Sequence, residues 1–395
     1  MPLPGDFRGS RPLEGVRVLD LTRLIPGPFA SLVLADLGAT VDKVEDTGGG
    51  DYLRHFPPLV AEGYSAGFAA LNRGKRSLIL DLKHERGREV FAKLVAGYDV
   101  LFEQFRPGVL ERLGFGNERL RELNPKLIVC SLTGYGQDGP LAHRAGHDLN
   151  YLARAGVLGL HGPADAPPQV PGWQMADVGG GLWAVVGILA ALMDRSRTQK
   201  GCHIDIAMSD SVQGFASASF GAILAGVMPP RGDDLLTGGI APYNTYLSSD
   251  GAPITLAALE PKFWTTFCMA VGIEPDMSAL MPGPHQAELK RMLAEIFASK
   301  TRAEWEAFAA EHDCCVEPVL RPDELREDAH LRARQLFFSL ATKQGSVEQF
   351  RTPVTPLDER FSPPPQPGEH SDAILREAGI DESRIAELRS LGVVR

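Results

Sequence analysis

The first part of the chain alternates short apolar runs with longer amphipathic segments. The apolar runs have the length of buried strands and lie at residues 16–21, 100–103 and 127–132, and residues 40–45 and 77–82 also read as strands. Residues 26–37 and 85–96 carry apolar side chains at helical spacing, the first with a proline near its start. Because strands that alternate with helices form βαβ units, this pattern predicts an α/β domain whose parallel sheet is covered on both faces.

The pattern changes in the second half. An apolar helix is expected over 177–193, a strand over 202–207 and a second apolar helix over 209–225. Over 228–260, strand-like runs alternate with turn residues, and Ser249-Asp250-Gly251 is typical of a hairpin. Further helices are expected at residues 263–271, 286–299, 302–311 and, after a Pro-rich connector, 382–391.

This organisation predicts a large α/β domain over residues 1–227 and a small α+β domain over residues 228–325. The 44% hydrophobic and 23% charged residues are those of a soluble globular protein. The net charge of −10 argues against a nucleic-acid partner, which would require clustered excess Lys and Arg. The most apolar stretch, 182–193, is too short to span a bilayer, so we expect no membrane partner.

The five cysteines are scattered and odd in number, and no pair has zinc-site spacing. The start of the chain shows no apolar signal segment. We therefore expect reduced thiols in a cytoplasmic protein without a metal site.

Basic residues concentrate at 72–76 and at Arg106 with Arg112, in each case beside a predicted strand. Loops at the carboxyl ends of parallel strands bind ligands in open α/β sheets, and guanidinium forks suit phosphate. The alternative for both clusters is a solvated basic turn. No P-loop, GxGxxG, HExxH or GxSxG motif occurs, so a standard nucleotide-phosphate loop is not expected.

Three acid–base residues have both a structural and a functional interpretation. Asp177, before Gly179–Gly181, could cap a helix, and the helix N–H groups would then lower its pKa. The glycines would let a ligand approach closely. Backbone N–H groups near Gly179 would donate hydrogen bonds to an oxyanion. His147 could be structural or a general acid–base group. Glu260, beside Pro261, could be a first-turn acid of a helix.

Four segments together resemble the class III CoA-transferase superfamily: residues 12–45, 71–83, 105–116 and 124–140. The likeness runs from about Leu13 to the region of Cys314–Val319. It implies a large Rossmann-like parallel α/β domain, a smaller α+β domain and a return segment, 326–395, that completes the large domain. It also implies an interlocked homodimer.

Within that superfamily, residues 146–158, 235–246 and 259–264 resemble the α-methylacyl-CoA racemase branch. The resemblance implies α-proton exchange on a 2-methylacyl-CoA between His147 and Asp177, with Glu260 supporting the pair from the partner subunit. The alternative enzyme is a CoA-transferase in which Asp177 forms a covalent intermediate and His147 is a bystander. A CoA-binding subunit without activity is the third alternative.

The same resemblance implies that CoA is part of the acyl-CoA substrate rather than a permanently bound cofactor. The residues implied to contact it are Asp81, Leu82, Lys83, Arg112, Gly146 and Asp148. One departure concerns the nucleotide end of the site. Many relatives carry Arg after the Val-Glu of the second strand, where this chain has Asp46 followed by the glycine run 48–50.

Overall fold

The computed structural model describes residues 10–60, 64–343, 345–358 and 361–395. The chain forms two compact units. The first contains the described residues up to Ala155 together with Trp173–Phe215 and Ala329–Arg395, and the second contains Gly156–Gly172 and Ala216–Asp328. This division differs from the predicted bounds, because residues 156–172 and 216–227 group with the second unit.

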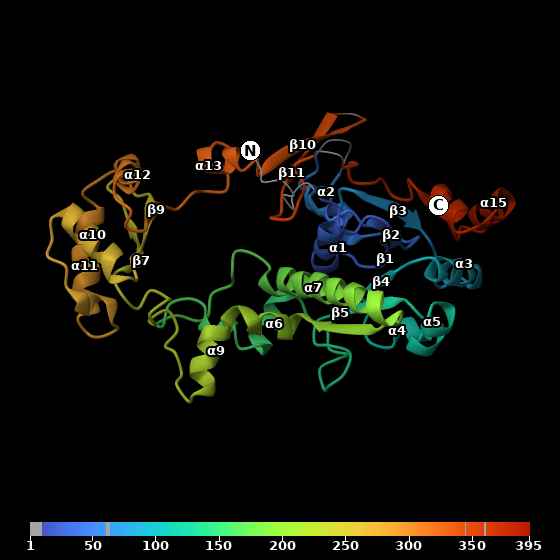
Figure 1. Ribbon diagram of the computed structural model, residues 1–395, viewed down its shortest axis with the longest axis horizontal. Coiled ribbons are helices and arrows are strands. Elements are labelled where there is room, and N and C mark those ends of the chain that lie inside the picture. The colour runs from blue at the N-terminus through green and yellow to red at the C-terminus, as the bar shows by residue number, and fades with distance from the viewer. Residues whose placement is uncertain (1–9, 61–63, 344, 359–360) are drawn as a thin grey trace. The chain divides into compact units, whose positions relative to one another are not determined.

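The first unit is built on a six-stranded sheet in the order β3-β2-β1-β4-β5-β6, with every pairing parallel (Figure 1). Its strands are β1 (Arg17–Asp20), β2 (Thr40–Glu45), β3 (Lys75–Ile79), β4 (Val100–Glu103), β5 (Ile128–Thr133) and β6 (His203–Ala207). Strands β1 to β5 are largely buried because helices cover both faces of the sheet, which explains the apolar sequences of β4 and of most of β1 and β5. Strands β2 and β3 are buried as well, although they carry charged residues such as Lys43 and Lys75. The predicted α/β class is confirmed.

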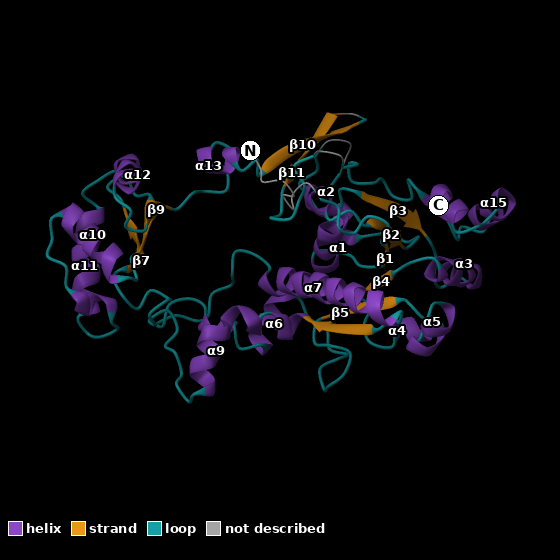
Figure 2. Ribbon diagram, viewed as in Figure 1, coloured by secondary structure: helices purple, strands orange, loops and turns teal. Residues whose placement is uncertain are grey.

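Helices α1 and α7 pack together on the sheet, α7 against β5 and β6. Helices α3, α5, α14 and α15 share a second apolar core with β1, β4 and β5 (Figure 2). The helices of this unit are α1 (Pro26–Asp36), α2 (Ala66–Leu71), α3 (Glu85–Ala96), α4 (Val109–Arg112), α5 (Asn117–Leu123), α6 (Asp148–Arg154), α7 (Met175–Thr198), α8 (Met208–Ser211), α13 (Ala329–Ala333), α14 (Ser371–Glu377) and α15 (Glu382–Ser390), with 3-10 turns η2 (Tyr52–His55) and η5 (Gln213–Ala216).

Helix α7 is longer at both ends than the predicted 177–193. Gly179, Gly180 and Gly181 are buried within it, and a Cβ at Gly181 would lie 2.7 Å from the Pro26 carbonyl oxygen. The three glycines therefore permit close helix packing, and the prediction that they admit a ligand is wrong. The predicted helix 209–225 is also wrong, because the chain there forms α8, η5 and a separate α9.

Among the described helices, α7 alone is long and apolar enough to cross a bilayer by length and composition. The prediction that the most apolar stretch is too short for this considered only residues 182–193, whereas the helix has 24 residues. Its residues are 39% buried over the most apolar window. Its buried positions pack on α1, α8 and β5, as in the core helix of a doubly wound domain.

The last part of the chain returns to the first unit and completes it. The backbone N–H of Asp81 donates to the Val393 carbonyl, and that of His370 to the Ser77 carbonyl. A hairpin that the sequence pattern did not predict, β10 (Phe337–Thr342) with β11 (Gly345–Phe350), packs on η2 and α2.

The second unit has a three-stranded antiparallel sheet, β7-β8-β9, around an aromatic core that includes Trp264, Phe267, Phe297 and Trp305. Its elements are η4 (Leu158–Leu160), α9 (Ser217–Leu224), β7 (Tyr243–Leu247), β8 (Pro253–Ala257), α10 (Pro261–Val271), η6 (Met277–Leu280), α11 (Gln286–Phe297), α12 (Arg302–Glu311) and β9 (Val316–Pro318). The predicted hairpin turn joins β7 to β8.

Candidate active site

A cavity of about 370 Å³ lies at the carboxyl ends of β1 to β4. The strand order reverses between β1 and β4, and open α/β sheets bind ligands in the crevice at such a point. The residues that line the cavity are Leu21, Thr22, Arg23, Val44, Glu45, Asp46, Gly50, Asp51, Tyr52, Leu80, Asp81, Leu82, Lys83, Gln104, Phe105, Val109 and Leu113. Three of the six predicted CoA contacts are therefore in its wall.

The other three predicted contacts lie elsewhere in the first unit. Arg112 is exposed at the end of α4, between cavity residues Val109 and Leu113 in sequence. Gly146 and Asp148 do not line the cavity; Asp148 bonds the start of α7 instead, and Gly146 lies beside Tyr151.

The basic cluster at 72–76 is not a ligand site. Arg73 is fully buried and its guanidinium donates to Asp36 at 2.6 Å, while the Lys75 ammonium is buried on the Pro28 carbonyl. Arg76 pairs with Asp42 at 2.6 Å. Both interpretations of this cluster were wrong, because tertiary burial supplies each cation with a partner that the local sequence does not show.

Four cations at the carboxyl edge of the sheet have no carboxylate partner among the residues that the structure describes: Arg23, Lys83, Arg106 and Arg112. They follow β1, β3 and β4, so this edge offers unpaired cations to an anionic ligand although the whole chain is acidic. Sequence reasoning missed Arg23. Its position just after the first apolar strand was the signal that could have identified it.

Asp177 is the third residue of α7 rather than its cap. The carboxylate of Asp148 caps the helix from outside, accepting from the N–H groups of Ala176 (2.6 Å) and Asp177 (3.0 Å). Burial and, secondarily, the charge of Asp148 raise the pKa of Asp177 to about 7. The prediction of a lowered pKa is therefore wrong, because the helix N–H groups are already bonded to Asp148.

His147 is the N-terminal boundary residue of α6, directly before Asp148, and it is exposed. Its backbone N–H donates to the Asn150 side chain at 3.0 Å. Since Asp148 bonds the start of α7, the start of α6 is fixed against the start of α7. The structure thus brings the start of α6, with His147 and Asp148, to Asp177, which lies 29 residues after Asp148 in the sequence.

Tyr151 on α6 is a further titratable residue beside this constellation. Its hydroxyl donates to the Gly146 carbonyl. Burial, with a contribution from the Asp177 charge, raises the pKa of Tyr151 to about 12, and Arg106 acts on it in the opposite direction. Because β4 lies next to β5 in the sheet and α7 packs on β5 and β6, the β4 end of the cavity is the end nearest to the helix that carries Asp177.

The predicted N–H donors near Gly179 are not available to an oxyanion. Gly179 lies inside α7, where helix geometry pairs its N–H with the Met175 carbonyl. Glu260 belongs to the second unit, where it precedes Pro261 at the start of α10 and is exposed. It is therefore not part of the constellation that the first unit assembles by itself.

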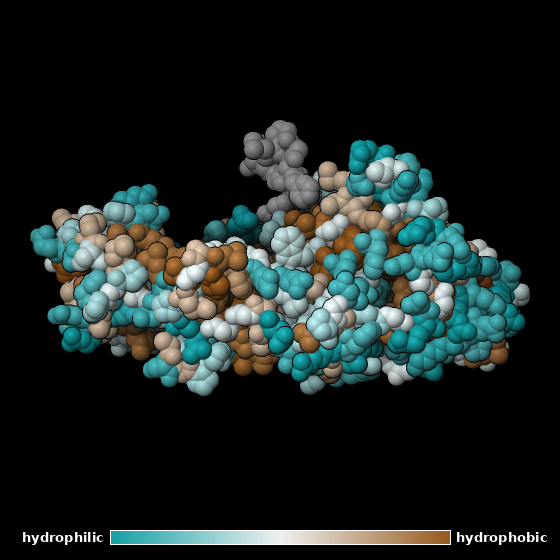
Figure 3. All heavy atoms as spheres, turned by 90° about the horizontal axis from the view of Figure 1, so that it is seen from below, coloured by the Kyte–Doolittle hydropathy of each residue, from teal (hydrophilic) through white to brown (hydrophobic). Residues whose placement is uncertain are grey.

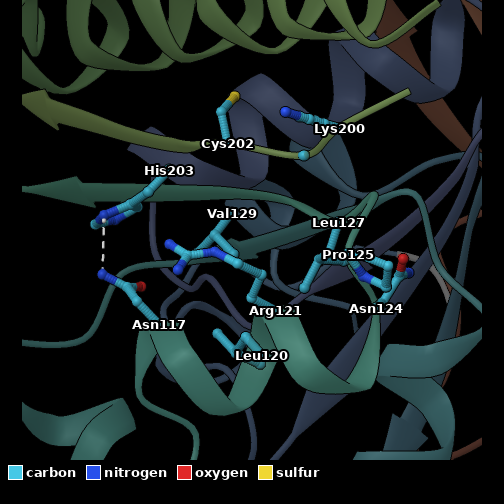
Figure 4. Close-up of a pocket in the computed structure, with 11 residues that line it drawn as sticks. Asn117, Leu120, Arg121, Asn124, Pro125, Leu127, Val129, Lys200, Cys202 and His203 are labelled. Atoms are coloured by element: carbon cyan, nitrogen blue, oxygen red, sulfur yellow. Dashed lines mark hydrogen bonds between the residues drawn. The ribbon is translucent and has the colours of Figure 1, made fainter. Parts of the chain in front are cut away.

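A further cavity of about 370 Å³ lies between α5 and the amino ends of β5 and β6 (Figure 4). Figure 4 shows Leu120 and Arg121 on the helix and Lys200 and Cys202 on the strand segment opposite them. Because this is the amino edge of the sheet, it is not the edge at which such folds bind their ligands. Within the described part of the chain, no group of His, Cys, Asp and Glu is arranged to hold a metal ion.

The fold and the site define a doubly wound α/β protein with a crevice at its switch point, lined by Arg23 and Lys83, and a helix-start carboxylate of raised pKa. The model of CoA-transferase family III matches residues 13–371, and the chain belongs to this family. It is 38% identical to the α-methylacyl-CoA racemase of Mus musculus over 97% of each chain. It is 32% identical to the succinyl-CoA:glutarate CoA-transferase of Mus musculus, over 98% of this chain and 92% of the relative.

A solved structure has the same fold. The CaiB/BaiF family protein from Brucella suis superposes with a TM-score of 0.82 at 34% identity, over 93% of this chain and 100% of that chain.

Proposed function

We propose that the protein is a 2-methylacyl-CoA racemase or epimerase that moves the α-proton of its substrate between His147 and Asp177. The observation that carries this proposal is the bonding of Asp148 to the start of α7, which fastens the start of α6, directly after His147, to the helix start that carries Asp177, a carboxyl group of raised pKa. The similarity to a racemase over nearly the whole chain supports it.

In one direction Asp177 removes the α-proton, the electron pair moves into the thioester carbonyl to form an enolate, and His147 returns a proton to the opposite face. In the other direction the two side chains exchange roles. A carboxylate whose conjugate acid has a pKa of about 7 is a stronger base than an ordinary aspartate, and it operates near neutral pH. Groups of this kind contribute about 10²–10⁴-fold each.

We propose that CoA binds as part of the substrate, with Asp81, Leu82 and Lys83 contacting it in the cavity wall and Arg112 at its rim. Gly146 and Asp148 would contact the thioester end. Since one oxygen of Asp148 already accepts two helix N–H groups, only its second oxygen is free for the substrate.

CoA transfer is the second candidate, and the similarity to a CoA-transferase over almost the whole chain favours it. Asp177 would then attack the acyl-CoA carbonyl, expel the CoA thiolate and form a mixed anhydride. This reaction requires a carboxylic acid as acceptor, whereas racemisation requires the acyl-CoA alone.

Exchange in heavy water separates the two functions. With (R)- or (S)-2-methylacyl-CoA as the only substrate, we expect deuterium at the α-carbon and loss of optical purity, measured by mass spectrometry and chiral chromatography. Absence of exchange from a panel of acyl-CoAs, together with CoA transfer once an acceptor acid is added, contradicts the racemase proposal.

We also propose that the active protein is an interlocked homodimer in which Glu260 supports His147 of the other subunit. Helix α7 has exposed apolar side chains, Leu182, Trp183, Val186 and Met193, which a second copy could cover. Hydrophobic residues also reach the surface on the face that Figure 3 shows. Sedimentation of a fully active monomer contradicts this proposal.

Replacing Asp148 by Asn should shift the pH profile of catalysis. The change removes the negative charge that helps to raise the pKa of Asp177, so this pKa should fall. The acidic limb of kcat/KM, where Asp177 acts as the base, should therefore move to lower pH. Asp138→Asn, an exposed acid outside the site, is the control and should leave the profile unchanged.

A further inference from the structure

We propose that Arg23, stacked on Tyr52, binds the ribose phosphate of the CoA nucleotide and replaces the cation that is missing at Asp46. This inference rests on the proposed use of CoA thioesters and adds a specificity residue to that site. It concerns the cavity at the carboxyl ends of β1 to β4, which Arg23, Asp46 and Tyr52 line together.

The direction of the substrate follows from the order of the strands. Asp177 lies on α7, which packs over β5 and β6, and β4 is the strand of the cavity that lies next to β5. The thioester must therefore lie towards the β4 side of the cavity. The nucleotide then extends towards β1, β2 and β3, where Arg23, Asp46 and Lys83 are located.

The cations that can bind a phosphate at the nucleotide end of the cavity are those without a carboxylate partner. Glu45 pairs with Arg54, and Asp51 with the buried Lys43. Arg23 and Lys83 remain without a carboxylate partner among the described residues, while Asp46 is exposed and accepts only the N–H of Gly48 there. A dianionic phosphate therefore meets a planar guanidinium from the β1 loop instead of a cation from the end of β2.

The loop that carries Arg23 is held in position by two contacts. The guanidinium lies 4.6 Å from the centre of the Tyr52 ring, a cation–π arrangement. One oxygen of Asp51 accepts from the N–H groups of both Leu24 and Leu53, which fastens the Arg23 loop to the turn that carries Tyr52.

The backbone at the next residue supports a positioning role. Leu24 has φ of +65°, a left-handed conformation that an apolar L-residue rarely adopts. Strained residues of this kind persist where the surrounding structure holds them, and they cluster at binding sites. Here the strain is stabilised by Asp51, which Lys43 holds at 2.9 Å.

The test compares three thioesters of the same acyl group, carried by CoA, by CoA without the 3′-phosphate and by pantetheine. For Arg23→Gln, we expect KM and the dissociation constant for acyl-CoA to rise about tenfold, the loss typical of one charged hydrogen bond. The values for the dephosphorylated and pantetheine thioesters should stay unchanged, and so should kcat. Arg23→Lys, which keeps the charge, should lose less.

Two further variants sharpen the result. Asp46→Arg in the Arg23→Gln background should restore preference for the 3′-phosphate, because it returns a cation to the same cavity. Arg86→Ala, which removes an exposed arginine of α3 outside the cavity, is the control and should change nothing.

Equal weakening of acyl-CoA and its dephosphorylated form, or no change in either, overturns the assignment of Arg23. If the unaltered protein binds no CoA thioester, the proposed function itself is wrong. Because the readout is binding, it does not depend on whether the reaction is racemisation or transfer.

Discussion

Asp177→Asn should reduce turnover by about 10²–10⁴-fold, in either direction of racemisation. The amide has nearly the shape of the carboxyl group but cannot take up the α-proton, whereas Asp177, with a pKa of about 7, can both accept and donate one near neutral pH. The loss is measured as kcat for each enantiomer at several pH values. The pH profile of the residual kcat should lack the dependence that reflects the titration of Asp177.

The matched control is Asp194→Asn, which changes an exposed acid in the last turns of the same helix α7. It should retain full activity. More than a tenth of normal activity in Asp177→Asn contradicts a catalytic role for this carboxyl group in both racemisation and transfer.

The same substitution should change stability in a pH-dependent way. Asp177 has a higher pKa in the folded chain than in the unfolded chain, so its contribution to stability is fully present below about pH 4 and is lost as the pH rises through about 7. In Asp177→Asn this side chain is neutral at every pH, so the variant does not lose this stability as the pH rises. The variant should therefore be more resistant to urea than the unaltered protein at pH 8. Catalytic groups commonly lower the stability of the protein in this way.

The parallel sheet was predictable because several of its strands, such as β4 and β5, are buried on both faces and carry apolar runs that alternate with amphipathic helices. The hairpin β10–β11 was not, since its strands alternate exposed and buried residues in a polar part of the chain. The region 209–225 read as one helix because apolar and small residues dominate it, yet the chain there leaves the helix at η5 and passes into the second unit.

The site was predictable only in part, because the contacts that determine its chemistry join residues far apart in the sequence. Residue type and resemblance identified His147 and Asp177, but neither could show that Asp148 takes the helix N–H groups and leaves Asp177 with a raised pKa. The basic cluster at 72–76 misled because ion pairs such as Arg73 with Asp36 join residues far apart in sequence. Arg23 was overlooked because its significance depends on a cavity formed by several loops.

His147→Gln should abolish racemisation while leaving one partial reaction intact. Without the imidazole, no proton can reach or leave one face of the enolate, so interconversion should fall by about 10²–10⁴-fold in both directions. Asp177 should still exchange the α-hydrogen of the enantiomer that faces it. We therefore expect deuterium uptake with retention for one enantiomer and none for the other, measured by mass spectrometry after chiral separation.

The complementary pattern is expected for Asp177→Asn, in which exchange should persist only for the opposite enantiomer. His143→Gln, which alters an exposed histidine close to the site in sequence, is the control and should behave as the unaltered protein. If His147→Gln keeps both exchange and racemisation, His147 is a bystander. Full CoA transfer in this variant, with no exchange in the unaltered protein, then favours the transferase chemistry of Asp177, because that reaction needs a carboxylate nucleophile and no second acid–base group.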